Sequence, residues 1–83
     1  MDQIARNPQQ LGAALRRRRK ALELSQRHLS DRTALRQATL SDLETGEGDP
    51  KLSTLMAALA ALDLELVVRP RTKGGAADLF LPS

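Results

Sequence analysis

The chain has 83 residues, enough for one small domain, and 41% of them are hydrophobic although Phe80 is the single aromatic residue. It has no cysteine, which excludes disulfides and thiolate metal sites, and no apolar run near the roughly 18–20 residues of a membrane span. The N-terminus lacks the apolar segment of a signal peptide. We therefore expect a cytoplasmic protein that has no cofactor or metal and does not bind a membrane.

The formal net charge is +3, but the charges are unevenly distributed along the chain. Residues 1–36 hold nine Arg or Lys against three acidic residues, whereas residues 37–68 hold one Lys against six acidic residues. A basic half of this kind is expected to face a polyanion. The alternative for the basic run at residues 16–20 is a solvated helix face without a partner.

The first seven residues show no periodicity and predict a flexible arm. Asn7 followed by Pro8 is typical of a helix N-terminus, and the spacing of apolar residues predicts a helix over residues 8–22. The inner stripe of this helix comprises Leu11, Ala14, Leu15 and Leu22.

Two arginines fall on or beside that inner stripe. Arg18 can extend along its aliphatic stem to solvent or pair with a carboxylate, because an unpaired buried charge would cost several kcal/mol. For Arg19 the candidate partner is Glu44, at the end of a later helix.

Residues 25–46 predict two short helices, at 26–33 and 37–45, joined by a tight turn. Ser25 is a good N-cap for the first, and Gly46 is typical of a C-terminal stop for the second. The inward residues are Leu29, Leu35, Leu40 and Leu43. The outward residues have short or hydrogen-bonding side chains, which suit the edges of DNA bases. They are Arg36, Gln37, Ala38, Thr39, Ser41 and Asp42.

A fourth helix, predicted over residues 52–62, is apolar on almost every side and therefore indicates a subunit interface, the alternative being a buried role within the chain. Residues 64–68 then alternate with period two, and Pro70 ends the pattern. We interpret residues 63–70 as a strand that pairs with its copy in a second subunit; the alternative is an extension of the preceding helix. Its dimerisation residues are Leu64, Leu66, Val67 and Val68.

Residues 71–83 are predicted to be a flexible tail. Leu79, Phe80 and Leu81 near its end either fold back on the domain or bind a partner protein.

Over residues 8–62 this pattern resembles the Cro/C1 (Xre) family of phage-repressor-type helix-turn-helix proteins. The matching positions are Ser25, Gln26, Leu29, Leu35, Gln37, Ala38, Thr39, Leu40, Ser41, Leu43, Glu44 and Gly46. Within that family, the sequence at 37–41, the terminal strand and the small size are similar to HipB-like antitoxins of HipA-type kinase toxins. The resemblance implies a mainly α domain of four to five helices, with the C-terminal β-strand in an intersubunit two-stranded sheet of a dimer.

The resemblance also assigns roles to individual residues. Gln26, Gln37 and Thr39 would bind the DNA backbone or line the groove. Arg27, Arg36, Ala38 and Ser41 would read bases. Arg19 and Glu44 match the structural ion pair of the family.

Three positions depart from the family pattern. Ala34 stands where the family usually has Gly, so the turn is either not left-handed or carries roughly 1 kcal/mol of strain. Arg18 replaces an aliphatic residue, while Leu22 stands where a charge is common. Asp42 would repel phosphate; it could instead accept from cytosine N4 or restrain a neighbouring Arg.

The expected function is that of a homodimeric repressor that binds an inverted-repeat operator in double-stranded DNA, and of an antitoxin that neutralises a HipA-like kinase and represses its own operon. The alternatives are an ordinary Xre-type repressor without a toxin, and an interaction module whose DNA binding is incidental. We do not expect an enzyme. His28 is the single histidine, and Asp42 and Glu44 lie on different helix faces, so neither pattern indicates a catalytic site.

Overall fold

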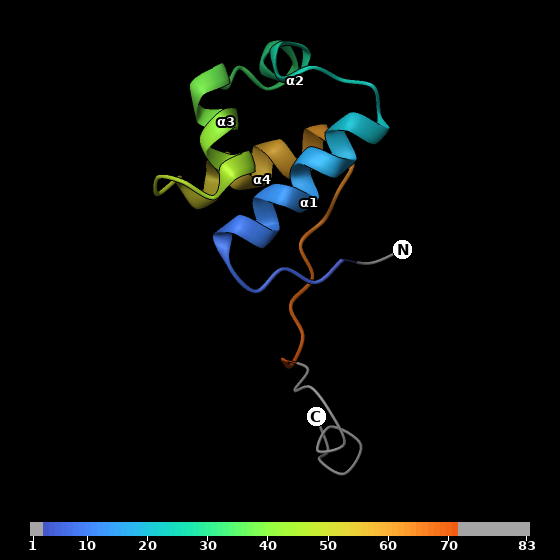
Figure 1. Cartoon of the computed structure of the whole chain (residues 1–83), viewed down its shortest axis with the longest axis vertical. Coiled ribbons are helices and arrows are strands. Elements are labelled where there is room, and N and C mark those ends of the chain that lie inside the picture. The colour runs from blue at the N-terminus through green and yellow to red at the C-terminus, as the bar shows by residue number, and fades with distance from the viewer. Residues whose placement is uncertain (1–2, 72–83) are drawn as a thin grey trace.

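The computed structural model describes residues 3–71. The described part is mainly α and contains four helices, which are α1 (Pro8–Ala21), α2 (Gln26–Thr33), α3 (Gln37–Thr45) and α4 (Leu52–Ala61). Figure 1 shows α2 and α3 meeting at an angle on one side of the longer α1, with α4 behind. The predicted tail residues Leu79, Phe80 and Leu81 lie outside the described residues.

Local capping explains where α1 begins. Asn7 is extended, and its side-chain Oδ1 accepts a hydrogen bond from Gln10 N at 2.8 Å. The Gln10 side chain in turn accepts from Arg6 N at 2.7 Å. Pro8, which has no amide hydrogen to satisfy, occupies the first turn.

The end of α1 corrects the prediction for Leu22. The helix stops at Ala21, Leu22 is its C-cap, and Glu23 has a left-handed backbone with φ of 58°. Because the chain turns there, Leu22 leaves the inner stripe and is 39% exposed. Its predicted place in the core is therefore wrong.

A small aliphatic core joins all four helices. Leu29 of α2 and Leu40 of α3 are buried, as predicted from their spacing. The full set of buried apolar residues is Leu15, Leu29, Leu40, Leu43, Ala58, Leu59 and Leu62. Leu24 and Leu35, which lie in the connections on either side of α2, are partly buried against this core.

Gly12 sets the distance between α1 and α3. A Cβ atom at this position would lie 2.3 Å from the carbonyl oxygen of Leu43 and 2.6 Å from that of Glu44. Since both obstacles are backbone atoms, no side chain fits unless the two helices separate. Glycine therefore allows α1 to hold α3 at close range.

The turn between α2 and α3 is left-handed at Ala34, with φ of 61° and ψ of 13°. Of the two alternatives for this position, the strained one is observed. Hydrogen bonds on either side hold the turn: Ala34 N donates to Ser30 O at 3.0 Å, and Leu35 N donates to Thr33 Oγ1 at 3.1 Å. The Ser30 hydroxyl donates to Leu35 O.

The chain leaves α4 through another left-handed residue, Asp63, with φ of 56°. Leu64 N donates to Leu59 O at 2.8 Å, and Arg18 Nε donates to Leu62 O at 2.9 Å. Residues 64–71 then form neither a helix nor a paired strand. The alternative in which this segment extends the preceding helix is therefore wrong.

A β-strand is identified by its hydrogen bonds to a second backbone segment. Within residues 3–71, no two segments pair in this way. The predicted intersubunit sheet stays a prediction. Between residues 3 and 71, none of the helices has the length and apolar character needed to cross a membrane.

Candidate nucleic-acid interface

The start of α2 is fixed by reciprocal hydrogen bonds. Ser25 Oγ accepts from His28 N at 3.0 Å, and His28 Nδ1 accepts from Ser25 N at 3.4 Å. The predicted N-cap at Ser25 is confirmed. His28 acquires a role that its position alone did not indicate, because an imidazole takes the place of the usual Glu or Gln in this capping box.

A buried ion pair connects α1 to α3. Arg19 Nε donates to Glu44 Oε2 at 2.6 Å and Arg19 Nη2 donates to Glu44 Oε1 at 2.9 Å. The two side chains are 10% and 5% exposed, respectively, and Arg19 Nη1 also donates to Leu24 O at 2.8 Å. This is the pairing expected for Arg19 and Glu44. The hydrogen bond to Glu44 raises the pKa of Arg19 above its usual value, although burial acts in the opposite direction.

Gln26, at the start of α2, joins the same pair. Its Nε2 donates to Glu44 Oε1 at 3.2 Å, so one carboxylate receives donors from both α1 and α2. Gln26 is half-buried, which leaves part of the amide open to solvent. The residue expected on a DNA phosphate is therefore oriented by the pair that holds α1 against α3.

The N-terminal end of α3 is the part of the helix best suited to bind an anion. Its N-cap, Arg36, is extended, and no side chain of the described residues caps the first turn. The backbone N–H groups of that turn have no partner within the helix, and the helix dipole favours negative charge there. Arg36, Gln37 and Ala38 are all exposed at this end.

The remaining residues assigned to DNA are placed on α2 and α3. Arg27 is exposed in the first turn of α2, and Thr39 and Ser41 of α3 are half-buried. The structure brings Gln26, Arg19 and Glu44 into direct contact. Within the described residues, no hydrogen bond or ion pair joins the members of the base-reading set, so their common role stays a prediction.

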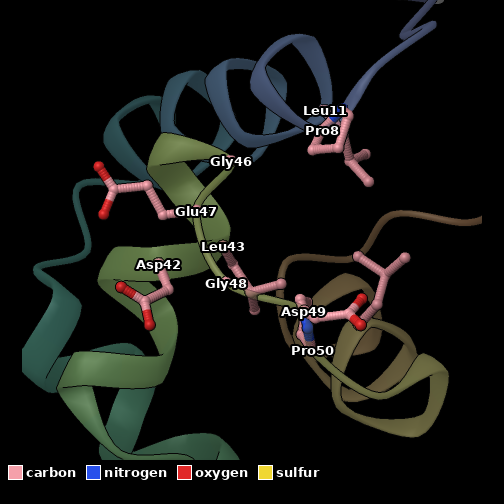
Figure 2. A pocket seen from close by; sticks show the side chains of 10 residues that line it. Pro8, Leu11, Asp42, Leu43, Gly46, Glu47, Gly48, Asp49 and Pro50 are labelled. Atoms are coloured by element: carbon pink, nitrogen blue, oxygen red, sulfur yellow. The ribbon is translucent and has the colours of Figure 1, made fainter.

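A pocket of about 220 Å³ lies beside the C-terminal end of α3 (Figure 2). Its lining includes acidic residues of α3 and of the loop that follows, and the full lining is Pro8, Leu11, Asp42, Leu43, Gly46, Glu47, Gly48, Asp49, Pro50 and Leu55. This end of α3 is therefore acidic where the other end is basic. In the part of the chain that the structure describes, no cluster of three or more His, Cys, Asp and Glu side chains could hold a metal ion.

This group of carboxylates was not predicted from the sequence. Asp42 lies on a predicted helix, whereas Glu47 and Asp49 lie in the residues that follow it, and no sequence spacing joins the three. The loop turns back beside α3 through two left-handed glycines, Gly46 with φ of 76° and Gly48 with φ of 73°. The glycine spacing was the available signal for that turn.

Known proteins provide an independent comparison. Residues 15–68 match the family model described as helix-turn-helix, HTH_3. An uncharacterized HTH-type transcriptional regulator, y4dL, from Sinorhizobium fredii is 44% identical over 57 residues. That match includes 69% of this chain but spans 29% of the relative's length.

Solved structures of HipB have the same fold. Those described as a HipA-HipB-O2-O3 complex and as a HipB-O4 20mer complex each superpose with a TM-score of 0.76 at 26% identity. Each covers 83% of this chain and 97% of the HipB chain. The restriction-modification controller protein C.AhdI from Aeromonas hydrophila has a TM-score of 0.62 at 31% identity, covering 66% of this chain and 83% of its own. The chain therefore belongs to the helix-turn-helix family of DNA-binding regulators of the Cro/C1 (Xre) type.

Proposed function

We propose that the chain is a sequence-specific transcriptional repressor that binds an inverted-repeat operator as a homodimer and acts as the antitoxin of a HipA-like kinase. The observation that carries the DNA-binding part is the construction of α3. Its outer face presents Arg36 and short polar side chains, while Glu44 on the inner face is held by Arg19. A rigid helix with such a face fits the major groove.

The roles within the DNA complex divide by position. Arg36 and Arg27 reach guanine O6 and N7, whereas Ser41 and Ala38 bind a polar base edge and a thymine methyl. Gln26, Gln37 and Thr39 contact the phosphate backbone, where Gln26 is supported by Glu44. The uncapped first turn of α3 adds backbone donors.

The homodimer forms through the segment after α4. Leu66, Val67 and Val68 are 50%, 68% and 90% exposed in the single chain, an apolar area that a second copy would cover. Leu64 begins this segment and is partly buried against the core. Pairing of residues 63–70 with the same residues of a second copy satisfies the backbone of both, and the two α3 helices then enter major grooves about 34–36 Å apart.

The antitoxin role is supported by similarity to HipB, which has been solved in a complex with HipA. The coverage of 97% of the HipB chain supports a partner role for the whole domain rather than for one motif. An ordinary repressor of the same family is the second candidate, and its fold and DNA-binding surface would be the same. The presence or absence of a kinase partner distinguishes the two.

The DNA-binding roles can be tested with three alanine variants on an operator selected from random duplexes. Arg36→Ala should lower the preference for operator over random DNA by roughly 5- to 100-fold, because it loses a base contact. Gln26→Ala should weaken binding to both DNAs equally. Arg32→Ala is the charge-matched control, since Arg32 is an exposed arginine of α2 outside the proposed set. An equal loss on both DNAs for Arg36→Ala would contradict its base-reading role.

The dimer and the partner need separate measurements. Val67→Asp should convert the dimer to a monomer in sedimentation experiments, whereas Glu65→Gln, a neighbour on the same segment, should not. For the antitoxin role, the chain should co-purify with a HipA-like kinase encoded beside its gene and inhibit that kinase. A chain that binds its operator but has no such kinase neighbour or partner is an ordinary repressor.

A further inference from the structure

Asp42 is a carboxylate on the outer face of the proposed recognition helix. It lies four residues after Ala38, so the two side chains occupy the same face of α3 about 6 Å apart along its axis. Both residues are exposed. That separation is less than two base-pair steps, which places Asp42 within reach of the bases beside those that Ala38 would contact.

The Asp42 side chain is unengaged while its backbone is held in place. Its carbonyl oxygen accepts from Glu47 N at 2.9 Å and from Thr45 Oγ1 at 3.3 Å. Within residues 3–71, no donor or cation bonds to the carboxylate. Gly48 of the following loop lies beside it, and a Cβ atom built there would be in van der Waals contact with Asp42 Oδ2, at 3.5 Å. The carboxylate is therefore an acceptor with its capacity unused, on a rigid support.

The surroundings of Asp42 disfavour a phosphate. Figure 2 shows the carboxylates of Asp42 and Glu47 extending to the same side of the loop after α3. Neither forms an ion pair with a described residue. The negative charges of both groups repel the DNA backbone, whereas the Asp42 carboxylate, which lies on the outer face of α3, can accept hydrogen from an amino group of a base.

The major-groove edges of the four bases differ in what they offer a carboxylate. Guanine presents only acceptors, and thymine presents an acceptor and a methyl group. Adenine has the N6 donor, but its N7 acceptor lies beside it and repels the second carboxylate oxygen. Cytosine has the N4 donor without a neighbouring acceptor, so it is the base that a carboxylate selects.

We propose that Asp42 is a specificity-determining residue that accepts a hydrogen bond from cytosine N4 and repels the alternatives at that position. The inference rests on the proposed function, since it requires α3 to read bases. Asp42 would add an acidic residue to the base-reading residues, which are otherwise basic or small. The operator is expected to contain a cytosine within two base-pair steps of the base pair that Ala38 contacts.

Selection from a random double-stranded library, followed by sequencing, tests this proposal. The proteins are the wild type, Asp42→Ala, the isosteric Asp42→Asn, and Glu47→Gln as the control that removes a neighbouring charge from the loop. We expect the wild type to enrich cytosine at one position per half-site. Asp42→Ala should lose that preference alone, by roughly 5- to 100-fold in relative affinity, and Asp42→Asn should replace cytosine by adenine, whose N6 and N7 fit an amide.

Retention of the cytosine preference by both Asp42 variants would overturn the proposal, as would its loss in Glu47→Gln. Asp42→Asn keeps the shape of the side chain, so it answers the question even if Asp42→Ala folds poorly. Failure of the proposed function has a different signature. A wild type that enriches no base at any position refutes base reading by α3 altogether, whereas loss of other preferences in Arg36→Ala with none in the Asp42 variants refutes only this inference.

Discussion

The buried pair of Arg19 and Glu44 offers a quantitative test of how the recognition helix is held. Replacement of either residue by methionine leaves the other charge buried without its partner, which costs about 3–5 kcal/mol. For Glu44→Met we expect the lower value, because Arg19 keeps its bond to Leu24 O. A domain of this size has a total unfolding free energy of about 4–12 kcal/mol, so either change removes a large fraction of it.

The expected fall in melting temperature is about 12–40 °C, because losses of about 3–5 kcal/mol correspond to about 4–8 °C per kcal/mol for a domain of this length. Because the chain has no Trp or Tyr, unfolding should be followed by circular dichroism of the helices rather than by intrinsic fluorescence. Protein concentration must be the same for all variants, since the stability of a dimer depends on it.

The double variant distinguishes a true pair from two independent residues. With Arg19→Met and Glu44→Met combined, no charge is left uncompensated, so the loss should be smaller than the sum of the single losses by about 2–3 kcal/mol. Additive losses, or a loss below about 1 kcal/mol for each single variant, would refute the reasoning.

Three further predictions concern pH and the backbone. The pKa of Arg19 is raised in the folded protein, so the stabilisation from its charge is fully present at any pH below the usual pKa of arginine. The difference in unfolding free energy between wild type and Arg19→Met should therefore stay constant from about pH 7 to 10. Ala34→Gly should raise the unfolding free energy by about 1 kcal/mol, whereas Ala60→Gly, within α4, should lower it by a similar amount. Gly12→Ala should lower it by more than about 2 kcal/mol in denaturant titrations, since its Cβ would meet the Leu43 carbonyl.

The helices were predictable because their ends depend on local chemistry. Asn7 and Ser25 accept bonds from residues three positions later, and Gly46 has the left-handed backbone that glycine allows. Nothing outside a few neighbouring residues is needed for these features. The bounds of α2 and α3 consequently agree with the prediction, and those of α1 and α4 differ by one residue at the C-terminal end.

Features that depend on contacts between helices could not be obtained from spacing. Leu22 has the right spacing for the core, but the left-handed Glu23 turns the chain before Leu22 can enter it. Gly12 has no side chain, so a search for periodic apolar residues does not detect it. It nevertheless sets how closely α1 and α3 pack. Arg18 interrupts the aliphatic stripe, and its Nε donates to the carbonyl of Leu62, a contact between distant residues that spacing does not predict.

The contact between Gln26 and Glu44 means that the support of α3 and the binding of DNA share one carboxylate. Loss of DNA affinity in an Arg19 variant could therefore come from unfolding or from a displaced Gln26. The melting temperature separates the two causes. Gln26 is uncharged, so the loss of its phosphate contact should leave the slope of log affinity against log salt unchanged, because that slope follows the number of phosphates neutralised by Lys and Arg. Gln26→Ala should therefore weaken DNA binding and keep the melting temperature, because Arg19 still donates two bonds to Glu44, whereas an Arg19 variant should lower both.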